Sequence, residues 1–155
     1  MTVGNLDFPC ALGGSGRSHL KREGDGATPF GTFRLERVLY RADRIQRPRT
    51  VLPVSLIGDS DGWCETVGDR NYNRQIKLPY PASHELLKRQ DRLYDIIVVL
   101  SHNQRPRIQG LGSAVFFHLA REDYAPTAGC VAVSLRDMRT ILGLCGIRSA
   151  IVTAS

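Results

Sequence analysis

The sequence predicts a β-rich α+β fold with few helices. Short apolar runs recur along the chain, and clusters of Gly, Pro, Asn and Asp separate them, which is the pattern of short strands joined by turns. Only residues 83–92 and 134–145 have the spacing of apolar side chains that is typical of a helix. With 155 residues, the chain has the length of one domain, 1–155, and can bury a core without a disulfide or a metal.

The N-terminal part contains three predicted strands and a sharply shaped loop. Residues 3–12 are a weak strand candidate that ends in a glycine-rich turn. The loop 21–33 contains several glycines and a proline, and residues 33–40 follow it as a strand with partial alternation. Residues 51–57 are interrupted by Pro53, which indicates a strand at the edge of a sheet.

The middle of the chain combines a long polar connection with the most apolar strand. Residues 58–80 are rich in Gly, Asp and Asn, and we expect them to form a loop that Trp63 anchors on the core. Residues 83–92 follow as a short helix with Ser83 as its N-cap. Residues 93–100 are almost entirely apolar, which predicts a strand that is covered on both faces.

The C-terminal part predicts three strands and one capped helix. Residues 114–119 and 130–133 have the composition of buried strands, and residues 147–153 make a last short one. Ser134 and Asp137 form a capping box at the start of the helix, and the apolar side chains that follow fall on one helical face. These side chains are Leu135, Met138, Ile141, Leu142 and Cys145.

The charge of the chain favours anionic partners without indicating nucleic acid. The formal net charge is +6, but the basic residues are dispersed among acidic ones, and no nucleic-acid motif is present. No apolar run is long enough to cross a bilayer, and the N-terminus lacks the basic and apolar regions of a signal peptide. Either the protein stays in the cytoplasm, or an export signal is missing from the start of this sequence.

The four cysteines have different settings. Cys10, Cys64, Cys130 and Cys145 form no C-x-x-C pair and are too widely spaced for a disulfide framework, so zinc-finger and thioredoxin-like functions lack support. Cys10 and Cys145 lie among apolar residues and are expected to pack as small core side chains. Cys130 alone has the setting of a reactive thiol.

A histidine and a cysteine on neighbouring apolar runs form the candidate site. His118 lies at the end of one run, and Cys130 opens the next, directly after Gly129. A thiol is a strong nucleophile as the thiolate, and a nearby imidazole is the usual means of forming one. Gly129 leaves space for a substrate carbonyl, and the amides of Gly129 and Cys130 are candidate donors to an oxyanion. The pattern predicts a Cys–His acyl-transfer site.

Two motifs extend this hypothesis. The segment from Thr127 to Cys130, preceded by His118, matches a histidine, a variable gap and then Ser/Thr-x-Gly-Cys. Residues 28–33 match Thr-Pro-x-Gly-x-Phe and lie upstream. In this order the two motifs resemble the L,D-transpeptidase catalytic domain family (YkuD-like), from about Leu6 to the C-terminal helix. Three further segments resemble a short, stand-alone bacterial branch of it: residues 72–74, 94–95 and 102–103.

The resemblance implies a fold, a substrate and a reaction. The fold is a curved mixed sheet or β-sandwich with a few short helices, and the substrates are peptidoglycan stem peptides. Cys130 attacks the third residue of a donor tetrapeptide and expels D-alanine, forming a thioester, while His118 acts as the base. An acceptor amine then takes the acyl group, which gives a 3-3 cross-link or a stem joined to another amine. No metal or organic cofactor is implied, and we expect a monomer in the periplasm or cell envelope.

Substrate recognition is expected to differ from the family pattern. The family usually has His at the position of Ala128 and Arg at that of Ala132, and its gap between the histidine and the cysteine is longer. The missing positive charge leaves three arginines as substitutes: Arg22, Arg74 and Arg121. We favour Arg74, since Tyr72 and Asn73 beside it offer polar contacts, and we count Arg22 and Thr127 among the candidate substrate-binding residues.

Three questions stay open at this level. Either a backbone carbonyl or Asn103 can orient His118. Water can replace the amine as acceptor, which makes the protein an L,D-carboxypeptidase or amide hydrolase with the same site. A non-catalytic basic module that binds an anionic envelope polymer is the third alternative, and it predicts binding that survives loss of Cys130 and weakens with salt.

Overall fold

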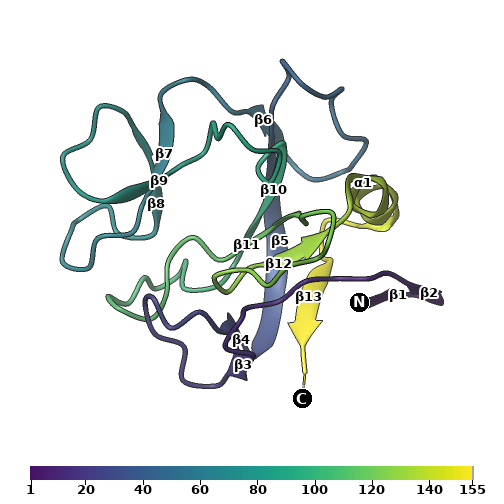
Figure 1. Ribbon diagram of the computed structural model, residues 1–155, viewed down its shortest axis with the longest axis horizontal. Helices are drawn as coiled ribbons and strands as arrows, with labels where there is room; N and C mark the ends of the chain where they lie inside the picture. Colours follow the sequence, from purple (N-terminus) through teal and green to yellow (C-terminus); the bar gives the residue numbers. More distant parts are fainter. Residues whose placement is uncertain (155) are drawn as a thin grey trace.

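A six-stranded mixed sheet forms the centre of the protein in the computed structural model, which describes residues 1–154 (Figure 1). Five strands follow the order β12-β11-β10-β5-β13, and β6 pairs with the other half of the outer edge of β5. β11 and β12 run parallel, whereas β10 is antiparallel to both β5 and β11. The strands are β5 (Gly31–Tyr40), β6 (Val54–Leu56), β10 (Ile96–Leu100), β11 (Phe116–Leu119), β12 (Val131–Val133) and β13 (Ala150–Thr153).

One face of this sheet packs on the helix α1 (Leu135–Leu144). Ser134 caps the helix as predicted, since its hydroxyl accepts a hydrogen bond of 3.1 Å from the amide of Asp137. Met138, Ile141 and Leu142 are buried, which confirms the predicted apolar face. Their partners on the sheet alternate along the strands, and they include Val38, Val98, Phe117, Val131 and Val133.

The opposite face of the sheet packs on a smaller, three-stranded one with the order β8-β7-β9. Figure 1 shows these strands beside the central sheet, on the side away from α1. They are β7 (Asp61–Cys64), β8 (Arg74–Lys77) and β9 (His84–Leu86). Trp63 bridges the two sheets, because its ring meets that of Phe116 edge-on with 4.9 Å between the centroids. The predicted β-rich α+β class with a curved mixed sheet or sandwich is confirmed, although α1 is the single helix of residues 1–154.

Residues 83–92 are a strand and turns rather than the predicted helix. The segment His84–Leu86 pairs antiparallel with residues 62–64 of β7. In this conformation Leu86 is 51 % exposed while Leu87 is fully buried, so the two leucines point in different directions. The helix prediction is wrong because the local signals, a serine cap and closely spaced leucines, are weaker than long-range strand pairing and the burial of Leu87.

Two other boundaries also differ from expectation. Residues 58–80 contain the β7–β8 hairpin instead of a continuous loop, although Trp63 is buried as expected. Residues 3–12 are not one strand, because Gly4 has a φ of +60° and turns the chain between β1 (Thr2–Val3) and β2 (Leu6–Asp7). A short parallel pair, β3 (Arg17–Ser18) and β4 (Thr28–Pro29), lies at the bottom of the view in Figure 1. Within residues 1–154, no helix has the length and apolar character needed to cross a membrane.

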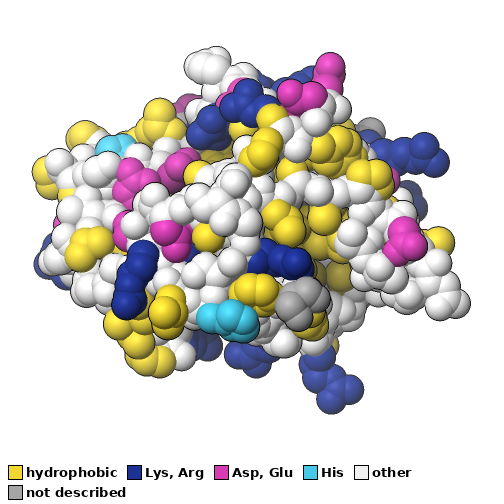
Figure 2. Space-filling model, turned by 60° about the horizontal axis from the view of Figure 1, so that its bottom comes forward, with side chains coloured by type: hydrophobic (Ala, Val, Ile, Leu, Met, Phe, Trp, Pro, Cys, Tyr) yellow, Lys and Arg dark blue, Asp and Glu magenta, His cyan; other side chains and the backbone are white. Residues whose placement is uncertain are grey.

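The surface charge is spread over the molecule. Figure 2 shows Lys and Arg side chains scattered around one face, with Asp and Glu between them. Eight ion pairs join residues of opposite charge in the described part of the chain, among them Arg41–Asp43 and Arg44–Asp95. This face therefore has no continuous basic stripe of the kind that follows a nucleic-acid backbone.

Candidate active site

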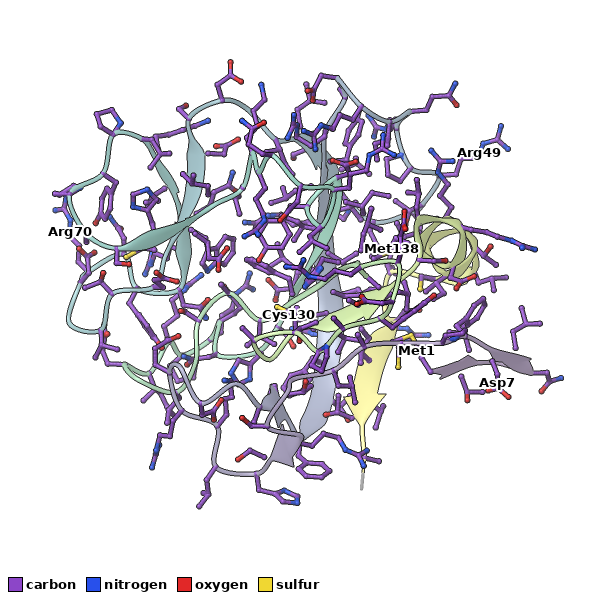
Figure 3. All side chains as sticks on the ribbon, in the orientation of Figure 1. Met1, Asp7, Arg49, Arg70, Cys130 and Met138 are labelled. Atoms are coloured by element: carbon purple, nitrogen blue, oxygen red, sulfur yellow. The ribbon has the colours of Figure 1, made fainter. Side chains whose placement is uncertain are left out.

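The strand register places His118 and Cys130 on the same face of the sheet. His118 of β11 pairs with Ala132 of β12, and Cys130 precedes Ala132 by two residues, so all three side chains point the same way. This is the face toward β7 and β9, and the side chains of His118 and Cys130 line one pocket of about 320 Å³. Figure 3 shows Cys130 near the middle of the molecule, whereas Arg49 and Arg70 lie at its periphery.

Cys130 is held as a neutral thiol. Its Sγ–H donates to the carbonyl oxygen of Ala114, and Sγ accepts a hydrogen bond from the amide of Phe116, both at 3.3 Å. The residue is 8 % exposed. Burial raises the pKa of the Cys130 thiol to about 12, against a smaller opposing effect of the Phe116 amide. At rest the side chain of Cys130 is therefore a thiol and not a thiolate.

His118 is a neutral imidazole with a defined tautomer. Its Nδ1–H donates to the carbonyl oxygen of Leu119 at 2.9 Å, which leaves Nε2 as the acceptor. Burial lowers the pKa of His118 to about 4, and Arg89 adds to this effect. The edge of the imidazole also packs against Tyr94, at 5.3 Å between centroids. Of the two predicted orienting groups, a backbone carbonyl takes this place, while the amide of Asn103 bonds within its own loop.

The thiol and the imidazole are both uncharged at rest. Among the described residues, no hydrogen bond joins the thiol of Cys130 to the imidazole of His118, and both groups are uncharged at neutral pH. A thiolate–imidazolium pair is disfavoured in so buried a site without further charge. The thiol proton can pass to Nε2 as the sulfur attacks a substrate carbonyl, because negative charge then moves to the carbonyl oxygen.

Close contact with the loop 21–33 shapes the backbone of Cys130. The carbonyl oxygen of Cys130 accepts hydrogen bonds from the hydroxyls of Thr127 at 2.7 Å and Thr28 at 3.5 Å. Thr28 in turn accepts a bond of 2.8 Å from the amide of Gly13. The amide of Gly129 donates to Thr127, so it is already engaged, and the candidate oxyanion donors reduce to the amide of Cys130.

Gly129 is required by geometry. Its φ is +134°, and a Cβ there would lie 2.7 Å from the carbonyl oxygen of Ala27. We expect Gly129→Ala to lower the free energy of unfolding by about 3 kcal/mol or more, since both backbone strain and a clash oppose the side chain. Gly68→Ala is the matched control, because Gly68 has a φ of +94° but open space around its Cβ position. Equal losses in urea denaturation would show that the clash with Ala27 is absent.

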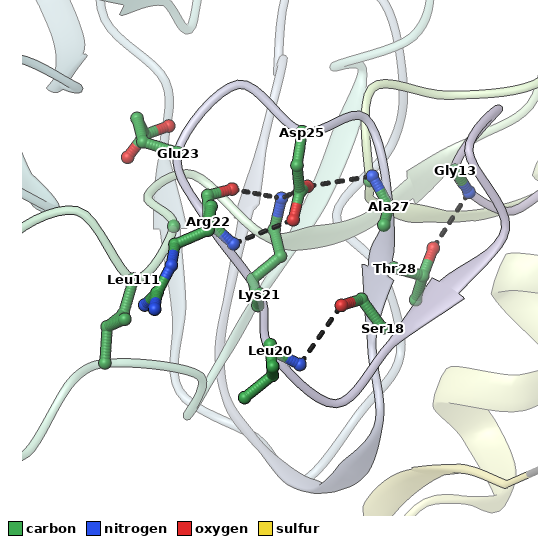
Figure 4. A network of polar contacts seen from close by, with 12 residues as sticks. Gly13, Ser18, Leu20, Lys21, Arg22, Glu23, Asp25, Ala27, Thr28 and Leu111 are labelled. Atoms are coloured by element: carbon green, nitrogen blue, oxygen red, sulfur yellow. Dashed lines mark hydrogen bonds and ion pairs between the residues drawn. The ribbon is translucent and has the colours of Figure 1, made fainter.

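Lys21 is a pocket residue that the sequence analysis did not single out. Its side chain is 8 % exposed. Its ammonium pairs with Asp25 and donates a hydrogen bond of 3.0 Å to the carbonyl oxygen of Arg22 (Figure 4). Its Nζ lies 3.5 Å from the position that a Cβ on Gly129 would take. The carboxylate of Asp25 also accepts hydrogen bonds from the backbone amides of Arg22 and Ala27, so it ties the two ends of this turn together. A single lysine in a glycine-rich loop carries no signal that separates it from surface lysines.

The wall of the pocket opposite Cys130 comes from β9 and the residues around it. Glu85, Arg89 and Tyr94 line the pocket with His118 and Cys130. The hydroxyl of Tyr94 donates to Glu85 at 3.3 Å, and the guanidinium of Arg89 lies over the Tyr94 ring, 5.0 Å from its centroid. Glu85 and Arg89 carry no signal in the sequence, because the helix predicted for residues 83–92 hides their orientation. Tyr94 belongs to the segment 94–95 that resembles the family branch, but the sequence predicts no role for it in the site.

The predicted substrate-binding residues separate into two groups. Thr127 lines the pocket, but Arg22, Tyr72, Asn73 and Arg74 are not among its lining residues. Tyr72 is buried and donates its hydroxyl to Glu23. Asn73 is also buried, and its Oδ1 accepts from the Trp63 indole at 2.9 Å and from the amide of Ala114 at 3.2 Å. Arg74 is exposed on β8.

Asn73 supports the site indirectly. It fixes the backbone of Ala114, which has a φ of +50° and whose carbonyl accepts the thiol hydrogen of Cys130. Arg121, the third arginine considered, is exposed and lines the pocket. In residues 1–154, no group of three or more His, Cys, Asp or Glu side chains has an arrangement that could hold a metal ion.

A buried thiol and a neutral imidazole on adjacent strands, both facing one pocket, are the elements of a cysteine-dependent acyl-transfer enzyme. The model of the L,D-transpeptidase catalytic domain (YkuD) matches residues 3–152, and the chain belongs to this family. The family acts on the peptidoglycan of the cell wall. Comparisons with curated proteins and with solved structures found no significant match.

Proposed function

We propose that the protein is a cysteine acyltransferase that acts on peptidoglycan stem peptides by L,D-transpeptidation. One observation carries the proposal: the parallel pairing of β11 and β12 directs His118 and Cys130 into the same pocket, with Nε2 of His118 unprotonated. Membership of the family supports the substrate class. The periplasm or cell envelope is the corresponding location, because the substrate lies there.

The first half-reaction forms a thioester. The sulfur of Cys130 attacks the carbonyl carbon of the third residue of a donor tetrapeptide while Nε2 of His118 takes the thiol proton. The bond between this carbon and the nitrogen of D-alanine then breaks. The leaving nitrogen keeps its electron pair and receives the proton from His118, so free D-alanine departs and the enzyme keeps the acyl group.

The second half-reaction transfers the acyl group. The nitrogen of an acceptor amine attacks the thioester carbon, and the C–S bond breaks with its electron pair on sulfur. His118 takes a proton from the attacking nitrogen and returns it to the sulfur of Cys130. The product is an amide, and the resting thiol is restored. Attack by water in place of the amine would give a tripeptide stem instead.

A single incubation tests the proposal. Purified protein is mixed with a disaccharide-tetrapeptide, and the products are identified by mass spectrometry. We expect a cross-linked dimer that lacks one D-alanine. Tripeptide alone would assign the protein as an L,D-carboxypeptidase, and salt-sensitive binding to an anionic polymer without turnover would favour the non-catalytic module.

Arg121 is the arginine that we propose to bind a carboxylate of the donor stem. It lines the pocket and follows the strand of His118, whereas Arg74 lies on β8 outside the lining. We expect Arg121→Ala to raise the donor KM about five-fold with little change in kcat, which is typical of a partly exposed charge pair. The matched variant Arg74→Ala should leave KM unchanged, and the reverse result would return the role to Arg74.

A further inference from the structure

The inner face of the small sheet contains several charged residues, and Glu85 is the one of them that lines the pocket, whereas Asp61 and Lys77 pair with each other outside its lining. Glu85 of β9 pairs with Trp63 of β7, so both side chains lie on the same face. Trp63 packs on Phe116 of the central sheet, which shows that this face is the inner one. Leu87, two residues further, is fully buried. Glu85 therefore points between the sheets, toward the pocket that contains Cys130.

The carboxylate of Glu85 is incompletely paired. Its contacts are the hydroxyl of Tyr94 at 3.3 Å and the guanidinium of Arg89 at 3.5 Å, both long for a charged hydrogen bond. Arg89 makes shorter bonds to Asp91, of 2.6 and 2.9 Å. The side chain of Glu85 is 31 % exposed, and partial burial raises the pKa of its carboxyl group. A carboxylate in this setting gains from a cation that enters the pocket.

The other acidic groups of the pocket and its buried lysine are better compensated. Lys21 pairs with Asp25, Glu65 accepts a hydrogen bond of 2.6 Å from Ser83, and Glu23 accepts one from Tyr72. Glu85 is also the charged group with the largest electrostatic influence on the thiol of Cys130, which it makes harder to ionise. The carboxylate of Glu85 therefore does not assist ionisation of the thiol with which it shares the pocket.

We propose that Glu85 is the residue that selects the acceptor, by binding the ammonium form of the acceptor amine next to the thioester on Cys130. This inference rests on the proposed function, because water needs no such anion while an amine is protonated at neutral pH. The Tyr94 hydroxyl, which donates to Glu85, positions the carboxylate.

The proton balance of this step is complete. The ammonium gives one proton to the Glu85 carboxylate, from which it passes to water. The neutral nitrogen then attacks the thioester carbon, the C–S bond breaks, and the second proton goes through His118 to the sulfur of Cys130. The amide product keeps the third hydrogen.

The test is the partition of the thioester between amine and water. In Glu85→Gln we expect the thioester on Cys130 to form normally, as seen by intact-protein mass spectrometry, while the ratio of cross-linked product to tripeptide falls about ten-fold, the usual size of one charged hydrogen bond. Hydroxylamine, which is uncharged at neutral pH, should trap the thioester equally well in wild type and Glu85→Gln. Glu85→Asp should keep most of the wild-type ratio.

Three outcomes separate the possibilities. Glu122→Gln is the matched control, because Glu122 is exposed and outside this pocket, and its ratio should equal that of wild type. An unchanged ratio in Glu85→Gln, or an equal loss of transfer to hydroxylamine, would overturn the role of Glu85 and leave the proposed function standing. A wild-type protein that forms no thioester would overturn both.

Discussion

Cys130→Ala is expected to abolish the thioester and to lower turnover by about 10⁴-fold or more, because the covalent step then has no nucleophile. The hydroxyl of Thr127 lines the same pocket but donates to the carbonyl of Cys130, so it is not available to replace the thiol. Intact-protein mass spectrometry after incubation with the tetrapeptide measures the effect directly. A residual thioester mass in the variant would contradict the assignment.

Stability has to be measured beside activity, because Cys130 also accepts a hydrogen bond. Loss of sulfur leaves the amide of Phe116 without its acceptor, and we expect a loss of about 1–3 kcal/mol in the free energy of unfolding. Cys64→Ala is the matched control, since Cys64 is fully buried in β7 but does not line the pocket. It should keep turnover with a comparable loss of stability.

Burial of the Cys130 thiol affects the rate at which alkylating reagents label it. Since the pKa of Cys130 is raised to about 12, alkylation at neutral pH should be slow and should speed up as the pH rises. The sequence alone predicts an activated thiol, because a nearby imidazole is the usual means of forming a thiolate. The structure places both groups in a buried site, where ion-pair formation is opposed by desolvation.

The part of the site that could be predicted from the sequence is the part encoded locally. His118, Gly129 and Cys130 lie within one short stretch, and the period of two along each strand fixes which side chains share a face. The Thr-Pro-x-Gly-x-Phe motif predicts membership of the family but not its place in the site, and in the structure the hydroxyl of Thr28 lies 3.5 Å from the Cys130 carbonyl oxygen.

The part that could not be predicted depends on pairing between distant segments. Glu85 reaches the pocket because β9 pairs with β7, which lies about twenty residues earlier in the chain. No local sequence pattern predicts a pairing between segments so far apart. A serine followed by polar and apolar residues fits a helix start as well as an edge strand. Gly112 leaves space for the buried Lys21, because a Cβ there would lie 3.0 Å from the lysine side chain.

The second large effect is expected from substitution of His118, the proposed base. In His118→Gln we expect thioester formation to slow by about 10³-fold, since an amide cannot take the thiol proton, while the substitution keeps a donor for the Leu119 carbonyl. Rapid-quench measurement of D-alanine release gives the rate of this step. His84→Gln is the matched control, because the Nδ1 of His84 also contacts a backbone carbonyl, that of Ala82 at 2.7 Å, but His84 lies outside the pocket.

His118 also predicts how stability depends on pH. Its pKa is lowered from 6.5 to about 4 in the folded protein. Between these pH values the imidazole is protonated in the unfolded chain but neutral in the native protein. The free energy of unfolding should therefore fall as the pH decreases from 6.5 toward 4, and this contribution is fully present above pH 6.5. In His118→Gln that share of the acid loss disappears, whereas in His84→Gln it remains. Identical pH dependence in wild type and His118→Gln, measured by urea denaturation, would show that His118 is not buried in its neutral form.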